Sequence, residues 1–224
     1  MATSPIRTSH DDEAQRRIPG YASLARLAVS MVAGFSSVEA DGSTVLVVGC
    51  GTGAELAEAM AQRPDWALTA VDPAAEMLTE AQRRLGDAAE AVRWIEGPAQ
   101  AVEGEGCFGA AIAVLVLQEL ADDGSKLEFL SALARLLKPG APLVLVDLMG
   151  GGSGLQGALD QQFQQALQRF QRSSGVPQTA ATETGLHPIG EARRLALLDA
   201  AGFSDPLRFY QALQVEGVLV QRRR

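Results

Sequence analysis

The stretch Val45-Leu46-Val47-Val48-Gly49-Cys50-Gly51-Thr52-Gly53-Ala54-Glu55 decides the fold of this chain. Its four branched apolar residues predict a buried strand. The three glycines that follow permit a tight turn in which a ligand lies against bare backbone. A helix is expected directly afterwards, from about residue 54 to residue 63, so that its free N–H groups face whatever lies on the turn. The stretch therefore predicts a ligand site between a strand and a helix.

A second strand is predicted at residues 66–72, and it ends in Asp72. Asp72 lies about 20 residues after the glycines, a spacing that suits a carboxylate accepting hydrogen bonds from two ribose hydroxyls. An adenosine-containing cofactor is therefore expected. An Asp before Pro73 is also a good helix cap, so Asp72 could serve both purposes.

Two kinds of cofactor fit the glycine pattern. Gly49-x-Gly51-x-x-Ala54 satisfies the loose dinucleotide fingerprint. The same stretch also contains Gly49-x-Gly51-x-Gly53, with the third glycine one place earlier than a dinucleotide turn requires. In this form it resembles motif I of the class I S-adenosylmethionine-dependent methyltransferases. The resemblance implies that the glycines approach the methionine part of the cofactor and that the acid after the second strand holds the ribose.

Three later stretches resemble the same family in the same order. Residues 91–97 are similar to its third strand, residues 107–120 to its fourth strand and the following turn, and residues 136–147 to the helix end, tight turn and fifth strand. The turn also has a local reason, because Pro139 ends a helix and Gly140 relaxes the chain reversal. The resemblance covers roughly residues 16–224 and implies S-adenosylmethionine as the cofactor.

Alternating strands and helices between residues 44 and 149 predict a parallel sheet with helices on both faces. The binding crevice of such a sheet lies at the carboxyl ends of its strands. Strands near residues 207–213 and 217–221 should close the chain as an antiparallel hairpin, as the methyltransferase fold would have it. The expected fold is therefore α/β: a Rossmann-like, doubly wound, seven-stranded, mostly parallel sheet with N-terminal helices and a helical insertion after strand five.

A single domain is expected for a chain of 224 residues. We expect residues 1–12 to form a disordered tail, 13–40 the N-terminal cap helices, 44–149 the cofactor-binding core, 150–189 a lid helix with its loop, and 190–224 the last helix and the hairpin.

A long amphipathic helix is predicted at about residues 155–172, after the glycine-rich residues 150–154. Its apolar face carries Leu155, Leu159, Phe163, Ala166, Leu167 and Phe170. Three interpretations are open: a lid over the substrate that hinges at the glycines, a helix packed on the sheet, or a surface for a homodimer.

A narrower resemblance concerns Arg17-Ile18-Pro19-Gly20-Tyr21 and Val116-Leu117-Gln118-Glu119-Leu120. Both segments resemble the methyltransferase-like enzymes that make carboxy-S-adenosylmethionine for wobble-uridine modification of tRNA, which implies that Tyr21 contacts the cofactor. Two positions depart from that branch. Pro98 stands where it has an Asp, and apolar Leu197 where it has an arginine for the extra carboxylate. The sequence therefore favours ordinary S-adenosylmethionine, with carboxy-S-adenosylmethionine synthesis as an alternative.

The residues expected to bind the cofactor follow the first four strands or precede the core. They are Tyr21, Gly49, Cys50, Gly51, Thr52, Gly53, Asp72, Pro73, Met77, Pro98, Ala99, Val114 and Leu115.

Three residues are candidates for catalysis. His187 lies in a loop that could reach the crevice, where it could take a proton from a substrate hydroxyl near neutral pH. Asp147, at the end of the fifth strand, is a second candidate base or substrate contact, and Tyr21 could hydrogen-bond the substrate. Methyl transfer needs in-line positioning, exclusion of water and at most one base. The predicted activity is methyl transfer to a small, partly apolar organic molecule; a non-catalytic, S-adenosylmethionine-binding regulatory protein is the other alternative.

Composition and charge argue against several other kinds of substrate, location and bound ion. The net charge of −8 and the pI near 4.8 argue against a nucleic-acid substrate, because phosphate binding needs a basic face. The sequence has no apolar run of about 18 residues that would span a membrane, and residues 1–17 lack the apolar segment of a secretory signal. Cys50 and Cys107 form neither a disulfide framework nor a metal-binding spacing. These features predict a cytoplasmic protein without a metal.

Overall fold

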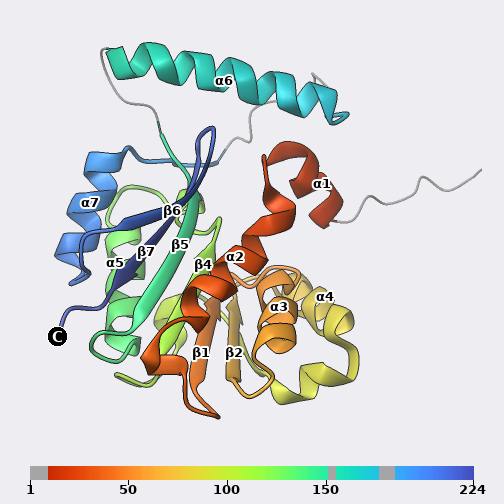
Figure 1. Cartoon of the computed structure of the whole chain (residues 1–224), viewed down its shortest axis with the longest axis vertical. Coiled ribbons are helices and arrows are strands. Elements are labelled where there is room, and N and C mark those ends of the chain that lie inside the picture. The colour runs from red at the N-terminus through yellow and green to blue at the C-terminus, as the bar shows by residue number, and fades with distance from the viewer. Residues whose placement is uncertain (1–9, 151–154, 177–184) are drawn as a thin grey trace, which may run out of the picture.

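The computed structural model describes residues 10–150, 155–176 and 185–224. Its strands (Figure 1) are β1 (Thr44–Val48), β2 (Ala67–Asp72), β3 (Arg93–Glu96), β4 (Ala110–Val114), β5 (Pro142–Leu148), β6 (Leu207–Ala212) and β7 (Val215–Gln221). Its α-helices are α1 (His10–Arg17), α2 (Tyr21–Ala33), α3 (Ala54–Gln62), α4 (Ala75–Leu85), α5 (Ser125–Leu136), α6 (Leu155–Ser173) and α7 (Glu191–Ala200).

In the described part of the chain, the strands form one seven-stranded sheet in the order β3-β2-β1-β4-β5-β7-β6. Strands β1 to β5 pair in parallel, whereas β7 is antiparallel to both of its neighbours. The order reverses between β1 and β4, and the turns that leave these two strands diverge at that point. In doubly wound sheets this is where ligands bind. The predicted α/β class, sheet and C-terminal hairpin are confirmed.

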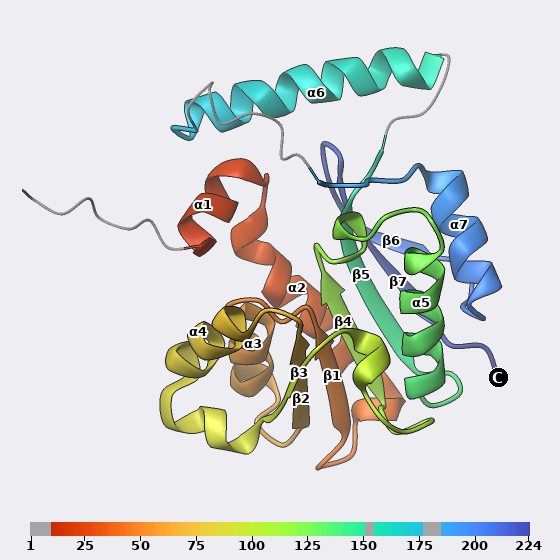
Figure 2. The ribbon, with the colours of Figure 1, turned by 180° about the vertical axis from the view of Figure 1, so that it is seen from behind.

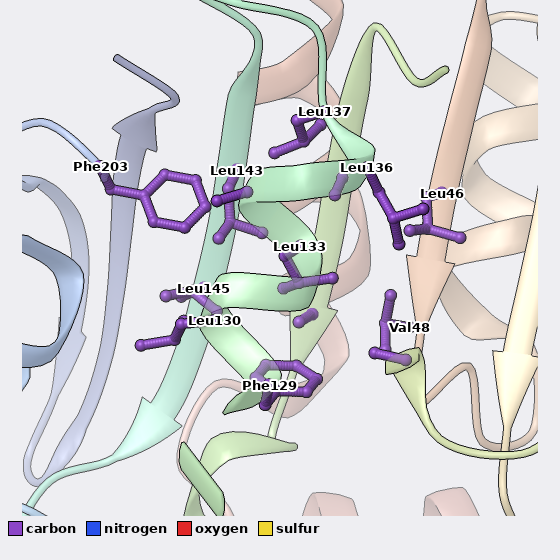
Figure 3. Close-up of a cluster of buried hydrophobic side chains, with 14 of the residues drawn as sticks. Leu46, Val48, Phe129, Leu130, Leu133, Leu136, Leu137, Leu143, Leu145 and Phe203 are labelled. Atoms are coloured by element: carbon purple, nitrogen blue, oxygen red, sulfur yellow. The ribbon is translucent and has the colours of Figure 1, made fainter. Parts of the chain in front are cut away.

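The two faces of the sheet carry separate apolar cores, because successive strand residues point to opposite faces. On one face, Leu46 and Val48 of β1 pack with leucines of α5 and with Phe203, as Figure 3 shows. On the other face, Val45 and Val47 pack with residues of α2 and α3. Burial on both faces explains why the β1 sequence is apolar without interruption, and it holds the carboxyl end of β1 rigidly.

Helix α6 stands over the carboxyl ends of the strands and apart from them, as Figures 1 and 2 show from opposite sides. Its C-terminal end lies beside α1, where the Gln171 side chain donates to the Arg17 carbonyl at 3.1 Å. Leu159 is 50% exposed and Phe163 is 37% exposed. The predicted long helix is present, but residues 151–154, on which the hinge prediction rests, lie outside the described residues, as do residues 177–184 of the loop that follows it.

The N-terminal helix is longer than the sequence suggested. We expected residues up to 12 to be disordered, whereas α1 begins at His10. Asp11, Asp12 and Glu13 occupy its first turn, where negative charge stabilises a helix N-terminus. This difference brings residues 10–12 into the site described below. None of the helices in the described residues is both long and apolar enough to cross a membrane.

Candidate cofactor and active site

A cavity of about 1000 Å³ opens at the carboxyl ends of β1 to β4. Its walls come from α1 and the start of α2, from the glycine turn after β1, and from the segments that follow β2, β3 and β4. All the predicted cofactor-binding residues except Gly53 line it. Its volume suits a ligand of nucleoside-cofactor size.

A glycine is required at each of the three positions of the turn for a different physical reason. All have positive φ, at 61°, 48° and 83° for Gly49, Gly51 and Gly53. A Cβ on Gly49 would lie 2.4 Å from a methyl of Val116, and one on Gly53 would lie 3.0 Å from Ala81 Cβ. A Cβ on Gly51 would meet no atom within 4 Å. Of the three, only Gly51 has open space where a Cβ would point, and the other two permit close packing within the protein itself.

Asp72 closes β2 and shapes both neighbouring turns. Its side chain is buried, and one carboxylate oxygen accepts the Gly51 N–H at 2.9 Å. The other oxygen accepts the Ala74 N–H at 2.9 Å, in the turn that precedes α4. Each carboxylate oxygen can accept a second hydrogen bond. Asp72 thus orders the protein and keeps acceptor capacity for ligand hydroxyls at the cavity.

Helix α1 closes the cavity on one side. The Thr52 hydroxyl, in the glycine turn, donates to Asp11 Oδ1 at 2.7 Å, and the Arg84 guanidinium of α4 donates to Asp11 Oδ2. Asp11 therefore joins α1 both to the glycine turn, which lines the cavity, and to α4. The sequence analysis missed this role because Asp11 stands 41 residues from Thr52 and carries no recognisable motif.

Glu55 is a second residue that the sequence analysis missed, although it stands next to the glycine turn. It lies in the first turn of α3, is 9% exposed and lines the cavity. Burial raises the pKa of this carboxyl to about 7. Burial, with the charge of Glu55, raises the pKa of the Tyr21 phenol to about 12. Tyr21 therefore stays protonated, whereas Glu55 exchanges its proton near neutral pH.

Cys50 also lies near this acid. Burial, with the charges of Asp72 and Glu55, raises the pKa of the Cys50 thiol to about 12. The thiol therefore stays neutral and unreactive at physiological pH, which leaves its backbone as the part of Cys50 suited to a ligand.

The segment after β3 forms the opposite end of the cavity. Pro98, Ala99 and Gln100 line it, and the Gly97 N–H donates to the Asp72 carbonyl at 3.0 Å. Ala99 is buried, whereas Gln100 is exposed. With Pro98 in place of an acid, the Gln100 side chain is the polar group available on this wall.

Two of the predicted catalytic residues do not line the cavity. His187 is exposed, and its backbone N–H donates to the Gln118 carbonyl at 2.6 Å. Asp147 is buried beneath the segment after β4, where it accepts the Gln118 N–H at 3.1 Å. Tyr21 does line the cavity. The fold therefore brings Tyr21 together with Glu55 rather than with the other two candidates.

Leu197, which stands where the carboxy-S-adenosylmethionine branch has its arginine, does not line the cavity, and neither do the neighbouring Arg193 and Arg194. Leu197 is buried in the apolar core. Arg193 pairs with Asp122, with its closest contact at 2.9 Å, and Arg194 is buried and pairs with Glu216 at 2.9 Å. Arg17 lines the cavity and pairs with Glu13 at 2.7 Å.

Comparison with known families agrees with this geometry. Residues 45–140 match the family model described as a methyltransferase domain. The match spans β1 to the turn before β5, and so includes the glycine turn, Asp72 and the walls after β3 and β4. No curated protein matches the chain.

Solved structures of methyltransferases share the fold of this chain. A mitomycin 7-O-methyltransferase has a TM-score of 0.63 and 20% identity, over 92% of this chain and 56% of its own. Human N-acetylserotonin methyltransferase in complex with S-adenosylmethionine has a TM-score of 0.61 and 19% identity, over 90% of this chain and 52% of its own. The chain thus spans about half the length of these two proteins.

A third solved structure is close to this chain in length. The Burkholderia thailandensis 1,6-didemethyltoxoflavin-N1-methyltransferase, with bound 1,6-didemethyltoxoflavin and S-adenosylhomocysteine, has a TM-score of 0.60 and 19% identity, over 100% of this chain and 94% of its own. These findings confirm the predicted Rossmann-like fold of the methyltransferase type. At such identities, similarity to the structures establishes the fold alone.

Proposed function

We propose that this chain binds S-adenosylmethionine in the cavity and transfers its methyl group to a small, partly apolar organic molecule. The observation that carries the proposal is the pairing of Asp72 with Gly51 at 2.9 Å beside open space. A carboxylate that retains acceptor capacity next to bare backbone suits a ribose. The methyltransferase domain match covers both residues.

Glu55 supplies negative charge at the other side of the glycine turn. It is buried, and in the ligand-free protein its ionisation is disfavoured by that burial. A cationic ligand would stabilise the ionised form, and the amino-acid part of S-adenosylmethionine carries an ammonium group. We therefore assign Asp72 to the ribose and Glu55 to the ammonium.

The reaction demands little of the protein beyond positioning. When bound, S-adenosylmethionine supplies a methyl group on an electrophilic sulfonium. The cavity walls hold the acceptor in line and exclude water. Tyr21, which lines the cavity and stays protonated, is better placed than His187 or Asp147 to hydrogen-bond an acceptor.

The charged residues that line the cavity favour a small neutral or cationic molecule as the methyl acceptor. Glu13, Glu119 and Glu128 line the cavity, and Arg17, which also lines it, is paired with Glu13. The net charge of −8 disfavours nucleic acid. For carboxy-S-adenosylmethionine synthesis, the arginines Arg193 and Arg194 pair with other acids, so a further carboxylate lacks a matching cation there. Mass spectrometry of the purified protein would detect a carboxylated cofactor if this alternative held.

Helix α6 is proposed as a lid over the acceptor. It stands over the carboxyl edge of the sheet, with Leu159 and Phe163 largely exposed. If α6 is a lid, the substitution Phe163→Ser raises the KM for the acceptor and leaves the molecular mass of the protein in solution unchanged. As a dimer surface, the same substitution converts a dimer to a monomer in light scattering.

Calorimetry with S-adenosylhomocysteine tests the proposed function. Asp72→Ala should weaken binding by about 1.5–3 kcal/mol, as for a charge-assisted hydrogen bond. Asp65→Ala is the matched control, because Asp65 precedes β2, does not line the cavity and pairs with half-buried Arg63. Equal affinity of the wild type and Asp72→Ala, or no binding by either, rejects the assigned pocket. A metabolite screen with a labelled methyl donor then identifies the acceptor, and binding without turnover of any metabolite favours a regulatory protein.

A further inference from the structure

The segment after β4 forms one wall of the cavity, and we call residues 114–120 the β4 wall. Its cavity-lining members are Val114, Leu115, Val116, Gln118, Glu119 and Leu120. Leu115 has a φ of 61°, in the left-handed region. A non-glycine residue in this region costs free energy and persists only where its surroundings hold it. The β4 wall therefore needs a group that keeps it in place.

Two buried charges contact the same peptide group of this wall, the one between Leu117 and Gln118. The Lys126 ammonium, fully buried at the start of α5, donates to the Leu117 carbonyl. The Asp147 carboxylate, buried in β5, accepts the Gln118 N–H at 3.1 Å. The carbonyl and N–H of a trans peptide point in opposite directions. The Lys126 ammonium therefore lies at the negative end of the peptide dipole and an Asp147 carboxyl oxygen at its positive end, so rotation of this peptide is opposed from both sides.

Further hydrogen bonds tie the same segment to β5 and to the loop before α7. The Gln118 side-chain oxygen accepts the Leu148 N–H at 2.8 Å. The Leu115 N–H donates to the Val146 carbonyl at 2.6 Å, and the Gln118 carbonyl accepts the His187 N–H at 2.6 Å. Val116 packs against Gly49, where a Cβ would lie 2.4 Å from its methyl. The peptide held by Lys126 and Asp147 therefore lies directly after Val116, the residue through which the β4 wall packs on the glycine turn.

Stability alone does not explain why these two charges are buried. Lys126 lies in the first turn of α5, where the helix dipole disfavours a cation. Asp147 interrupts an otherwise apolar, buried strand. Replacing a buried charge pair with apolar residues often leaves a protein as stable or makes it more so. The common contact of both side chains with one peptide of the cavity wall is a reason for their presence.

We propose that Lys126 and Asp147 are positioning residues, which hold the 117–118 peptide and thereby keep the β4 wall in the shape that binds the cofactor. The inference rests on the proposed function for the identity of the ligand. Neither residue needs to touch substrate, since each acts through the wall. Asp147 therefore has a role different from the base that its position at the end of β5 suggested.

Two measurements on the full chain test this role. The first is hydrogen exchange of the β4 wall without ligand, and the second is calorimetry with S-adenosylhomocysteine. In Asp147→Asn the wall amides should exchange at least tenfold faster, and affinity should fall at least about tenfold. Glu216→Gln is the matched control, because Glu216 is a buried acid paired with Arg194 away from the cavity. It should lower stability and change affinity less than twofold.

Two further variants separate positioning from general destabilisation. Lys126→Met/Asp147→Asn removes both charges, so it should recover much of the stability lost in Asp147→Asn without recovering affinity. Leu115→Gly removes the free-energy cost of a positive φ at this position, which the contacts of Lys126 and Asp147 with the 117–118 peptide offset in the wild type. In the Leu115→Gly background, Asp147→Asn should therefore weaken binding less than it does in the wild type.

The proposal is overturned if Asp147→Asn leaves both the exchange rates of the wall amides and the affinity unchanged. It is also overturned if Asp147→Asn and Glu216→Gln lose the same affinity for the same loss of stability. If Asp147→Asn does not fold, the double variant decides, and wild-type affinity in it rejects the role. If that variant also fails, fast exchange of the Gln118 amide in the wild type rejects it, and slow exchange supports it. Absence of wild-type binding would reject the proposed function, whereas the exchange measurement, made without ligand, would still test the wall.

Discussion

The Asp72 carboxylate accepts the backbone N–H of Gly51 at 2.9 Å, so the acid that ends β2 also orders the middle of the glycine turn after β1. A second hydrogen bond joins the same carboxylate to the Ala74 N–H at 2.9 Å. Two turns that belong to different strands thus share one acceptor. Binding and folding are therefore linked at this residue.

This link predicts a loss of stability as well as of binding. Asp72→Ala leaves the Gly51 and Ala74 N–H groups without their acceptor, and it should lower the free energy of unfolding by about 1–3 kcal/mol. Urea denaturation followed by circular dichroism measures the change. Asp72→Asn keeps one acceptor oxygen and should lose less. Equal stability of wild type and Asp72→Ala would show that the hydrogen bonds seen here contribute nothing.

The glycine turn predicts that binding and stability can be separated at Gly51. A Cβ at Gly51 meets no protein atom within 4 Å, so Gly51→Ala should lower stability by only about 1 kcal/mol, the cost of its positive φ. Its methyl group enters the ligand space and should weaken S-adenosylhomocysteine binding at least tenfold. Gly42→Ala is the control, because Gly42 has a φ of 74° and equally open surroundings. It should cost similar stability and leave binding intact.

Gly49→Ala should behave in the opposite way. Its new methyl would lie 2.4 Å from Val116, and overpacking of this kind costs about 1–3 kcal/mol in addition to the backbone cost. Thermal unfolding should therefore show a much lower midpoint than for Gly51→Ala. Midpoints in the reverse order would contradict the packing of the β4 wall on the glycine turn.

From the buried carboxyl of Glu55 we expect the stability of the protein to depend on pH in a specific way. Its pKa is raised from 4.5 to about 7 in the folded protein, so the folded state retains a proton that the unfolded state has lost between these values. The burial of Glu55 therefore costs stability increasingly as pH rises from 4.5 to 7, up to about 3 kcal/mol. Glu55→Gln should stabilise the ligand-free protein at pH 8 and change it little at pH 4.5. Comparing the two proteins at each pH cancels the contribution of Asp147, whose pKa is also raised to about 7 by burial.

Binding should show the reverse trend at the same residue. A cationic ligand needs ionised Glu55, so wild-type affinity for S-adenosylhomocysteine should rise between pH 6 and pH 8, and this rise should be lost in Glu55→Gln. Calorimetry at several pH values provides the measurement. An unchanged pH profile in the variant would remove Glu55 from the proposed ammonium site.

From the contacts of Asp11 we expect α1 to slow dissociation of the ligand. Its contacts to Thr52 and Arg84 hold α1 across the cavity. Asp11→Ala should weaken S-adenosylhomocysteine binding by about 0.5–1.5 kcal/mol, mainly through faster dissociation, as stopped-flow fluorescence would detect. Thr52→Val should act in the same direction. Thr79→Val, which removes an exposed hydroxyl on α4, should leave dissociation unchanged, and an equal effect there would argue against the contact.

The sequence by itself determined the elements and the cofactor crevice. The apolar run of β1, the glycines after it and the position of Asp72 depend on neighbours in the chain and on a fixed spacing, so their consequences follow from local geometry. The α6 helix could be predicted from its periodicity, and the C-terminal hairpin from the resemblance to the methyltransferase fold.

Tertiary structure alone decided which side chains share the cavity. Glu55 faces Tyr21, Asp11 contacts Thr52, and Asp147 faces the 117–118 peptide instead of the cavity. Each of these relationships joins segments whose relative placement depends on how helices pack on the sheet, and spacing along the chain does not encode that placement. The acids looked alike in the sequence, because burial, charge and hydrogen-bond partners distinguish them only after the chain has folded.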